Sequence, residues 1–217
     1  MNALPRNMLP DTIYDKWTKY LDRRNRGLKK ESKEALTDAI LSLESADKES
    51  IHQFVLYLTD LQRTVGEKID LRLFERILMP CLVDGITRNL PTYNRRIAQF
   101  EQMFYSSNSL FKAFKKMTRY AKQYFEPADF YKKELEIDPG DQIAIDGILN
   151  RIGWQLNYSI HELPEYGLIG ELDDFKSDLE QFKRYLNQSN NQDNWKKQLE
   201  KWDLVQGNME GLHGQSR

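Results

Sequence analysis

The sequence predicts an all-α protein of nine to ten amphipathic helices, and three observations support this prediction. Apolar residues recur at steps of three and four almost throughout the chain, which is the spacing of one face of an α-helix. Strict alternation of apolar and polar residues, the mark of a half-buried strand, is not sustained anywhere. The chain contains four valines, whereas strand-rich domains usually hold more β-branched residues.

Helices in the first part of the chain are delimited by capping residues. Pro10 and Asp11 open the first, and Gly27 and Gly66 close the first and third, since glycine adopts the left-handed conformation that ends many helices. Pro80 lies inside the fourth helix, where we expect a kink or a break because proline cannot donate a backbone hydrogen bond. The expected helices cover 11–27, run from residue 32, cover 47–66 and run from residue 70.

The remainder of the chain continues the helical pattern. Pro91 suits the first turn of a fifth helix, and Asn108 or Ser109 caps a sixth that ends at Glu126 and Pro127. A turn and cap cluster at 138–141 separates a short helix from a long one. The helices expected here cover 91–104, 108–124, 128–136, 141–163, 172–186 and 195–202, with a loop at 164–170.

The length of 217 residues suits one domain or two small ones. We expect a single all-helical domain over 1–204, with a possible sub-boundary near 126–128. The segment 205–217 carries three glycines after residue 206 and is expected to be a flexible tail. Amphipathic helices must bury their apolar faces on one another, and either stacked helical hairpins or an irregular bundle would do so.

One junction resembles a known family. Residues 131–141 read Tyr-Lys-Lys-Glu-Leu-Glu-Ile-Asp-Pro-Gly-Asp, similar to the end of a tetratricopeptide repeat, which closes its second helix with a Leu-Glu-x-Asp-Pro-x-Asp run and then begins a new helix. The resemblance covers this junction alone, and no 34-residue self-similarity accompanies it. It implies helical hairpins that stack on one another.

Charge and cysteine content indicate the cellular compartment of the protein and the classes of partner it could bind. The net charge is −1, from 32 Lys and Arg against 33 Asp and Glu, so no global field attracts nucleic acid or a membrane surface. Cys81 is the single cysteine and lies in an apolar stretch, which indicates a buried, inert thiol and a reducing compartment. The first residues lack the apolar region of a secretory signal, and no stretch could span a bilayer. We expect a cytoplasmic protein without a membrane partner.

Each catalytic or metal-binding pattern that the sequence begins is left incomplete. Glu49 and His52, like Glu210 and His213, have the Glu-x-x-His spacing of bundle metal sites, but we interpret both as chance. The zinc-protease helix pattern begins at His161 but fails, because position 165 is Glu rather than His. We therefore predict no catalytic residue, no metal site and no cofactor, and the sequence favours a function other than catalysis.

Basic residues form the clearest surface pattern. Lys112, Lys115, Lys116, Arg119 and Lys122 fall on one predicted helix with no acidic residue between positions 110 and 125. A second cluster comprises Arg23, Arg24, Arg26, Lys29 and Lys30. Either cluster could contact phosphates or an acidic partner, or the lysines could simply solvate an exposed face.

The loop between the two long helices is the other candidate. Tyr166 and Leu168 could dock into a partner from this loop, or the loop could fold back over the helix ends.

Taken together, the sequence favours a non-catalytic protein–protein interaction module that binds another protein or a peptide. The reasons are many amphipathic helices, abundant aromatic residues, which are favoured interface anchors, and no assembled active site. The alternative is a nucleic-acid-binding helical protein that uses the basic clusters.

Overall fold

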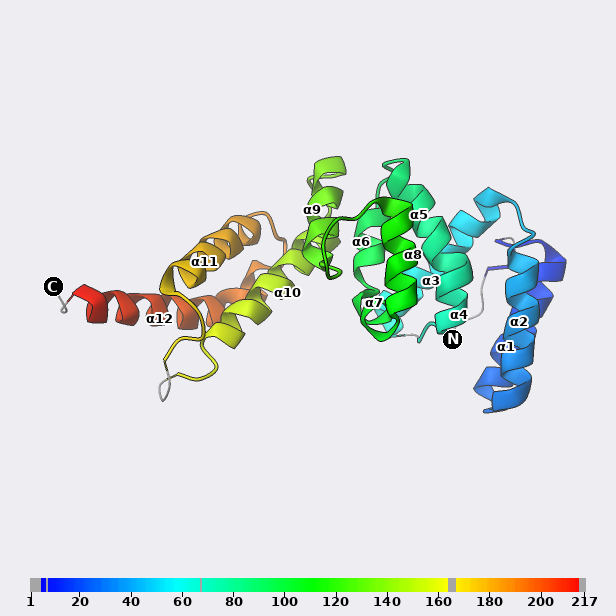
Figure 1. Cartoon of the computed structure of the whole chain (residues 1–217), viewed down its shortest axis with the longest axis horizontal. Coiled ribbons are helices and arrows are strands. Elements are labelled where there is room, and N and C mark those ends of the chain that lie inside the picture. The colour runs from blue at the N-terminus through cyan, green and yellow to red at the C-terminus, as the bar shows by residue number, and fades with distance from the viewer. Residues whose placement is uncertain (1–4, 7, 67, 164–166, 215–217) are drawn as a thin grey trace. The chain divides into compact units, whose positions relative to one another are not determined.

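The computed structural model describes residues 5–6, 8–66, 68–163 and 167–214, with side chains up to Met209. Every regular element in the described part of the chain is helical (Figure 1), which confirms the all-α prediction. The chain divides into two compact units, Met1–Glu126 and Pro127–Arg217. Each unit is described separately below.

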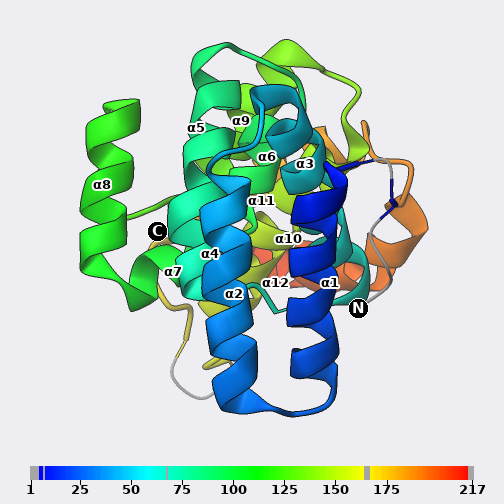
Figure 2. The same cartoon turned by 90° about the vertical axis from the view of Figure 1, so that its right-hand side faces the viewer.

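The N-terminal unit begins with an antiparallel hairpin of α1 (Asp11–Asn25) and α2 (Lys29–Leu43), which lie side by side in Figures 1 and 2. Gly27 turns the chain with a φ of +71°, in keeping with its predicted role as a helix stop. The second helix starts at Lys29 rather than at Ser32, because the amide of Ser32 already donates to the carbonyl of Leu28. Trp17 on α1 packs edge-on against Phe54 of α3, which joins the hairpin to the rest of the unit.

Helix α3 (Lys48–Val65) has the caps that the sequence predicted. The Asp47 side chain accepts a hydrogen bond from the Ser50 amide, and Gly66 ends the helix with a φ of +66°. Each cap satisfies backbone groups that the helix itself leaves without partners. The helix buries one face through Phe54, Val55 and Leu58.

Pro80 does not break its helix. The chain runs without interruption from α4 (Leu71–Leu73) through a π-helical segment, η1 (Phe74–Leu78), into α5 (Met79–Thr87). A proline in a regular helix removes one hydrogen bond and collides with the carbonyl four residues earlier. The wider π-helical turn just before Pro80 accommodates this disturbance. Of the kink or break expected at Pro80, the break does not occur, and the helix changes type instead.

Two predicted helices differ from the structure between residues 91 and 126. The fifth is divided into α6 (Tyr93–Ala98) and α7 (Glu101–Ser106), and the sixth, α8 (Asn108–Thr118), ends well before residue 124. Arg119 adopts a left-handed conformation with a φ of +56° and leads the chain out of the helix. This early end lets Phe125 return to the core, where its ring stacks on Phe104 at 4.3 Å between centroids and contacts Phe114.

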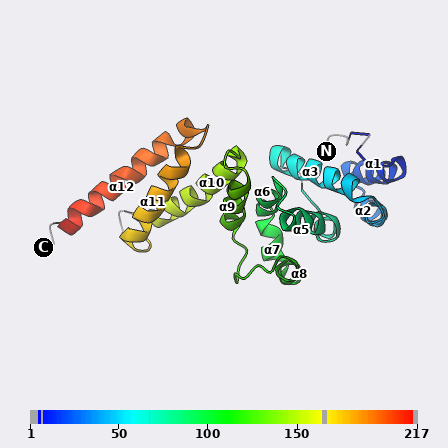
Figure 3. The same ribbon diagram turned by 90° about the horizontal axis from the view of Figure 1, so that it is seen from above.

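The C-terminal unit consists of α9 (Pro127–Ile137), α10 (Gln142–Ser159), α11 (Leu172–Leu186), the short 3-10 helix η2 (Gln192–Trp195) and α12 (Lys196–Gly214). Figure 3 shows α10, α11 and α12 following one another within this unit. Asp141 caps α10 by accepting from the amide of Ala144, as expected of the turn at 138–141. The core of the unit is apolar and brings together Ile148, Leu156, Phe175, Phe182 and Trp202.

Helix α12 extends to Gly214, past residue 204, where the sequence led us to expect the helical domain to end. Glycine in a helix interior costs about 1 kcal/mol relative to alanine, which weakens a helix without stopping it, and no proline follows Trp202. Residues 215–217 lie outside the described part of the chain. Across the described residues, every helix is too short or too polar to cross a lipid bilayer.

Candidate functional site

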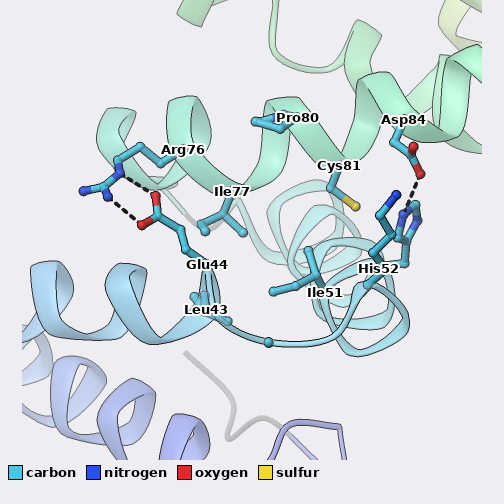
Figure 4. Close-up of a pocket in the computed structure, with 11 residues that line it drawn as sticks. Leu43, Glu44, Ile51, His52, Arg76, Ile77, Pro80, Cys81 and Asp84 are labelled. Carbon is cyan, nitrogen blue, oxygen red and sulfur yellow. Dashed lines mark hydrogen bonds and ion pairs between the residues drawn. The ribbon is translucent and has the colours of Figure 1, made fainter.

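A pocket of about 410 Å³ lies in the N-terminal unit between the end of α2, the start of α3 and the η1–α5 segment (Figure 4). This volume falls in the lower part of the range typical of ligand pockets. Its apolar lining comprises Leu43, Ala46, Ile51, Ile77, Pro80 and Cys81. The half-buried side chain of Ile51 faces the apolar side chains of η1 and α5 across the hollow.

A two-pronged ion pair closes one end of the pocket. The Arg76 guanidinium donates through Nε and Nη2 to the two carboxylate oxygens of Glu44, at 2.7 and 2.6 Å. This fork geometry is the strongest arrangement for an arginine and a carboxylate. It joins α2 to η1 at the surface and leaves the pocket with no uncompensated charge at this end.

His52 lies at the other end and connects three helices. Its Nδ1 is 2.5 Å from the hydroxyl of Tyr93 on α6, and its Nε2 is 3.1 Å from the carboxylate of Asp84 on α5. Because an ionised carboxylate can only accept, Nε2 carries the proton that is donated to Asp84. In the neutral imidazole Nδ1 then accepts from the Tyr93 hydroxyl, so both ring nitrogens are satisfied.

Ionisable groups around His52 are held in their ordinary charge states. Burial would raise the pKa of Asp84, but the hydrogen bond from Arg88 and the charge of Lys48 outweigh it and lower that pKa. Burial raises the pKa of the Tyr93 hydroxyl to about 12. Asp84 is therefore anionic and Tyr93 neutral over the physiological range.

Cys81 is buried, as the sequence predicted. Burial, and to a smaller extent the charge of Asp84, raise the pKa of its thiol to about 12. The thiolate is the reactive form of cysteine, so Cys81 is not an activated nucleophile, although it lies in the same pocket as His52.

The tight approach of Tyr93 depends on Gly85. The Tyr93 ring occupies the position that a Cβ on residue 85 would take. Glycine therefore allows α6 to approach α5 closely enough for the Tyr93 hydroxyl to reach His52. The glycine inside the predicted helix was the one visible sign of this contact, since glycine in a helix interior usually has a packing reason.

The structure separates the basic residues that the sequence placed on one helix. Lys112, Lys115 and Lys116 lie on α8, but Arg119 and Lys122 follow the end of that helix, so the prediction of a single five-cation helix is wrong. The helix ends at Thr118, and the chain after it brings the ring of Phe125 back to the core.

We call Lys112, Lys115, Lys116, Met117 and Arg119 together the α8 basic surface. Lys115 lies over the ring of Phe111, with Nζ 5.5 Å from its centroid, while Lys112, Lys116, Met117 and Arg119 are exposed. Across the described part of the chain, none of its four cations has a carboxylate within 4.0 Å. The surface therefore has no ion pair of its own to neutralise it.

The second basic cluster is partly used inside the unit. The Arg24 guanidinium donates to the carbonyl of Lys68, and Arg26 pairs with Asp22 at 3.4 Å. Arg23 is half-buried, and Lys29 and Lys30 are exposed at the start of α2.

The structure describes only one of the two loop residues, Tyr166 and Leu168, that were candidates for binding a partner. Tyr166 lies outside the described residues. Leu168 is half-buried and packs against the apolar core of the C-terminal unit. The amide of the next residue, Ile169, donates to the carbonyl of Ser159 at 2.8 Å, so this part of the loop lies back on the end of α10.

Sequence reasoning did not single out an aromatic pair on the outer face of α10. Trp154 is 63% exposed and Tyr158 is 53% exposed. Their rings stack at 5.7 Å between centroids and 11° between planes, and the Arg151 guanidinium lies 5.9 Å from the Trp154 ring. The sequence contained the information for this pair, because residues 154 and 158 are four apart and share the helix face opposite Ile152, Leu156 and Ile160. We call Arg151, Trp154 and Tyr158 the α10 aromatic surface.

The two units carry opposite charges, although the whole chain is nearly neutral. Residues 1–126 contain 22 Lys and Arg against 16 Asp and Glu, a formal charge of +6. Residues 127–217 contain 10 Lys and Arg against 17 Asp and Glu, a formal charge of −7. A net charge near zero for the whole chain thus conceals two strongly charged halves.

No family model matches this chain. No significant match was found among curated proteins or among solved structures. Within the described residues, no group of three or more His, Cys, Asp or Glu side chains is placed to hold a metal ion.

Proposed function

We propose that the chain is a non-catalytic protein–protein interaction module, and that the pocket between α2, α3 and α5 receives an apolar side chain of a partner peptide. The observation that carries the proposal is the pocket's composition. Its floor is apolar and open at the surface, the carboxylates at its two ends are paired with Arg76 and with His52 of the same unit, and Lys48 also lines it. A neutral apolar side chain suits such a site, because it gains from burial without breaking an ion pair.

The chemistry of the pocket favours binding over catalysis. A nucleophile of the Cys–His type needs a depressed thiol pKa, whereas the pKa of Cys81 is raised to about 12. The imidazole of His52 is occupied on both sides by Tyr93 and Asp84. The polar groups therefore support the walls of the pocket.

A selection of random peptides displayed on phage tests the proposal without knowledge of the natural partner. The immobilised full chain is the target, and an Ile51→Arg variant, which places a charged side chain in the pocket, serves for counter-selection. We expect enriched peptides that share an apolar anchor residue. They should bind the original chain at least about tenfold more tightly than the variant, as expected when a buried anchor is blocked.

Leu41→Arg is the matched control. Leu41 is exposed on α2 and does not line the pocket, so the same substitution there should leave peptide binding unchanged. Peptides that bind the chain and the Ile51→Arg variant equally would reject the pocket as the site. Turnover of a substrate by the purified chain, lost in the Ile51→Arg variant, would reject a non-catalytic function.

A further inference from the structure

The α8 basic surface is flanked by the segment between α8 and α9, which packs along the helix. The rings of Tyr120 and Phe125 in this segment contact Phe111 and Phe114 of α8. Phe125 is buried, whereas its neighbour Tyr124 is 64% exposed. An exposed aromatic side chain is therefore present on the segment that runs beside the cations of α8.

A second exposed tyrosine lies near this segment. Tyr105, at the end of α7, is 52% exposed, and its hydroxyl donates to the carbonyl of Phe125 at 3.4 Å. Phe125 directly follows Tyr124 in the chain. Two phenol rings are therefore accessible at the flank of α8.

The part of the chain that supplies this surface contains cations alone among its charged residues. Residues 102–125 hold five Lys and Arg and no Asp or Glu. Lys112, Lys116 and Arg119 are exposed, and none of them has a carboxylate within 4.0 Å in the described part of the chain. They belong to the unit of formal charge +6. The surface therefore attracts an external polyanion, and no ion pair has to be broken when that polyanion binds.

We propose that this surface binds single-stranded nucleic acid, with phosphates on Lys112, Lys116 and Arg119 and an unpaired base stacked on Tyr124. Proteins that bind single strands combine a basic track for the backbone with aromatic rings on which bases stack. Lys112 and Lys116 are four residues apart and share one helix face, so they form the start of such a track. Lysine–phosphate contacts and ring stacking carry little sequence information, so the binding tolerates many sequences.

Other polyanions match the surface less completely. An acidic peptide offers carboxylates to the cations, but its charged groups give Tyr124 nothing planar to stack on. A duplex offers phosphates, but its bases are paired and stacked inside the helix. A single strand supplies phosphates and free base faces together.

Fluorescence anisotropy of labelled single strands of about 12 nucleotides, titrated with the full chain, tests the proposal. The strand is used as RNA and as DNA, and the tighter of the two identifies the source of the ligand. We expect the logarithm of the binding constant to fall with the logarithm of salt concentration with a slope of roughly −2 to −3, as for three or four phosphate contacts. A duplex of the same sequence should bind more weakly at the same salt.

Two kinds of variant separate the phosphate contacts from the stacking. Lys112→Glu/Lys116→Glu should weaken binding at least about tenfold at low salt and make the salt slope shallower by about 1.4. Tyr124→Leu should weaken binding at least about fivefold without changing the slope, whereas Tyr124→Phe, which keeps the ring, should bind like the original chain. The three substituted side chains are exposed, and circular dichroism checks that each variant is folded.

Lys19→Glu/Lys33→Glu is the matched charge control. It makes the same change of net charge in the same unit, on exposed residues of α1 and α2. Most of the affinity should remain, because the phosphates contact α8 and not this hairpin.

Three results would overturn the proposal. The first is the absence of binding at low salt with the chain at about 100 μM, where even non-specific complexes form. The second is a polyglutamate peptide that competes as well as unlabelled strand while Tyr124→Leu has no effect, which would assign the surface to an acidic protein. The third is an equal loss in the Lys19→Glu/Lys33→Glu control, which would assign binding to the net charge of the unit. The Ile51→Arg variant should bind the strand like the original chain, so the outcome is independent of the pocket.

Discussion

The ring of Tyr93 fills the space that a side chain on residue 85 would need, and its hydroxyl reaches Nδ1 of His52 at 2.5 Å. A methyl group at position 85 would push the ring away and disturb the connection between α3, α5 and α6. We therefore expect Gly85→Ala to destabilise the chain by about 1–3 kcal/mol, the usual cost of overpacking a core, although alanine is the better helix former. Urea denaturation followed by circular dichroism measures the change.

Gly207→Ala is the control for this prediction. Gly207 lies in α12 with no atom within 4 Å of a Cβ added there, so alanine should stabilise by about 0.5–1 kcal/mol through helix propensity alone. Equal effects at the two positions would contradict the packing role of Gly85.

Arg96 and Arg63 both pair with Asp60 but in different surroundings. The Arg96 side chain is 6% exposed and donates to both oxygens of Asp60, to the Thr59 hydroxyl and to the Leu56 carbonyl. Arg63 lies 3.9 Å from the same carboxylate and is 38% exposed. We expect Arg96→Ala to cost about 3 kcal/mol or more and Arg63→Ala about 0.5 kcal/mol or less. Thermal unfolding of both variants measures the two losses of stability. Similar losses would show that burial does not distinguish the Arg96–Asp60 pair from the Arg63–Asp60 pair.

Stability should fall at alkaline pH partly because of Cys81. Its thiol pKa is raised from 9.0 to about 12 in the folded chain, so the folded state holds its proton more tightly than the unfolded state does. This contribution is complete below pH 9 and is lost as the pH rises from there toward 12. At pH 10.5 the loss amounts to about 2 kcal/mol, from 1.36 kcal/mol per pH unit.

Cys81→Ala removes this contribution, and urea unfolding at pH 8 and pH 10.5 measures it. The variant should lose about 2 kcal/mol less than the original chain between these pH values. Tyr93 remains in both chains, and its pKa is raised to about 12 by burial and, to a smaller extent, by the charge of Cys81. An identical pH dependence in the two chains would contradict the assignment.

Trp154 and Trp202 should differ sharply in their effect on stability. Trp202 is fully buried in the C-terminal unit, where its Nε1 donates to the Asn157 side chain, and Trp202→Ala should cost about 3–5 kcal/mol. Trp154→Ala removes a mostly exposed ring and should cost less than about 1 kcal/mol. Chemical denaturation compares the two, and a large loss at Trp154 would mean that the ring serves the fold rather than a partner.

Local signals in the sequence predicted much of the fold. Asp47 and Gly66 delimit α3 as expected, because a cap depends on residues within one turn of the helix end. The range 172–186 predicted from helical spacing likewise matches α11, whose buried residues Phe175, Leu179 and Phe182 recur at steps of three and four. These features depend on neighbours in sequence and can be recognised from a short segment.

Long-range contacts explain what sequence reasoning missed. The end of α8 at Thr118 depends on Phe125 reaching Phe104, a partner 21 positions away. The pocket depends on His52 meeting Asp84 and Tyr93, which are 32 and 41 positions away on other helices. Periodicity alone contains no information on which helices meet, so the sequence showed His52 only in its Glu-x-x-His spacing with Glu49, which we interpreted as chance.

Glycines that face aromatic rings recur in the chain, and they restrict how its sequence can change. Gly147 lies under the ring of Tyr131, and Gly153 under those of Trp195 and Trp202, as Gly85 lies under Tyr93. At each position a larger residue is tolerated only if the opposing ring becomes smaller at the same time. Among sequences that share this fold, positions 85 and 93, 147 and 131, and 153 and 195 should therefore covary, with small and large side chains exchanged as pairs.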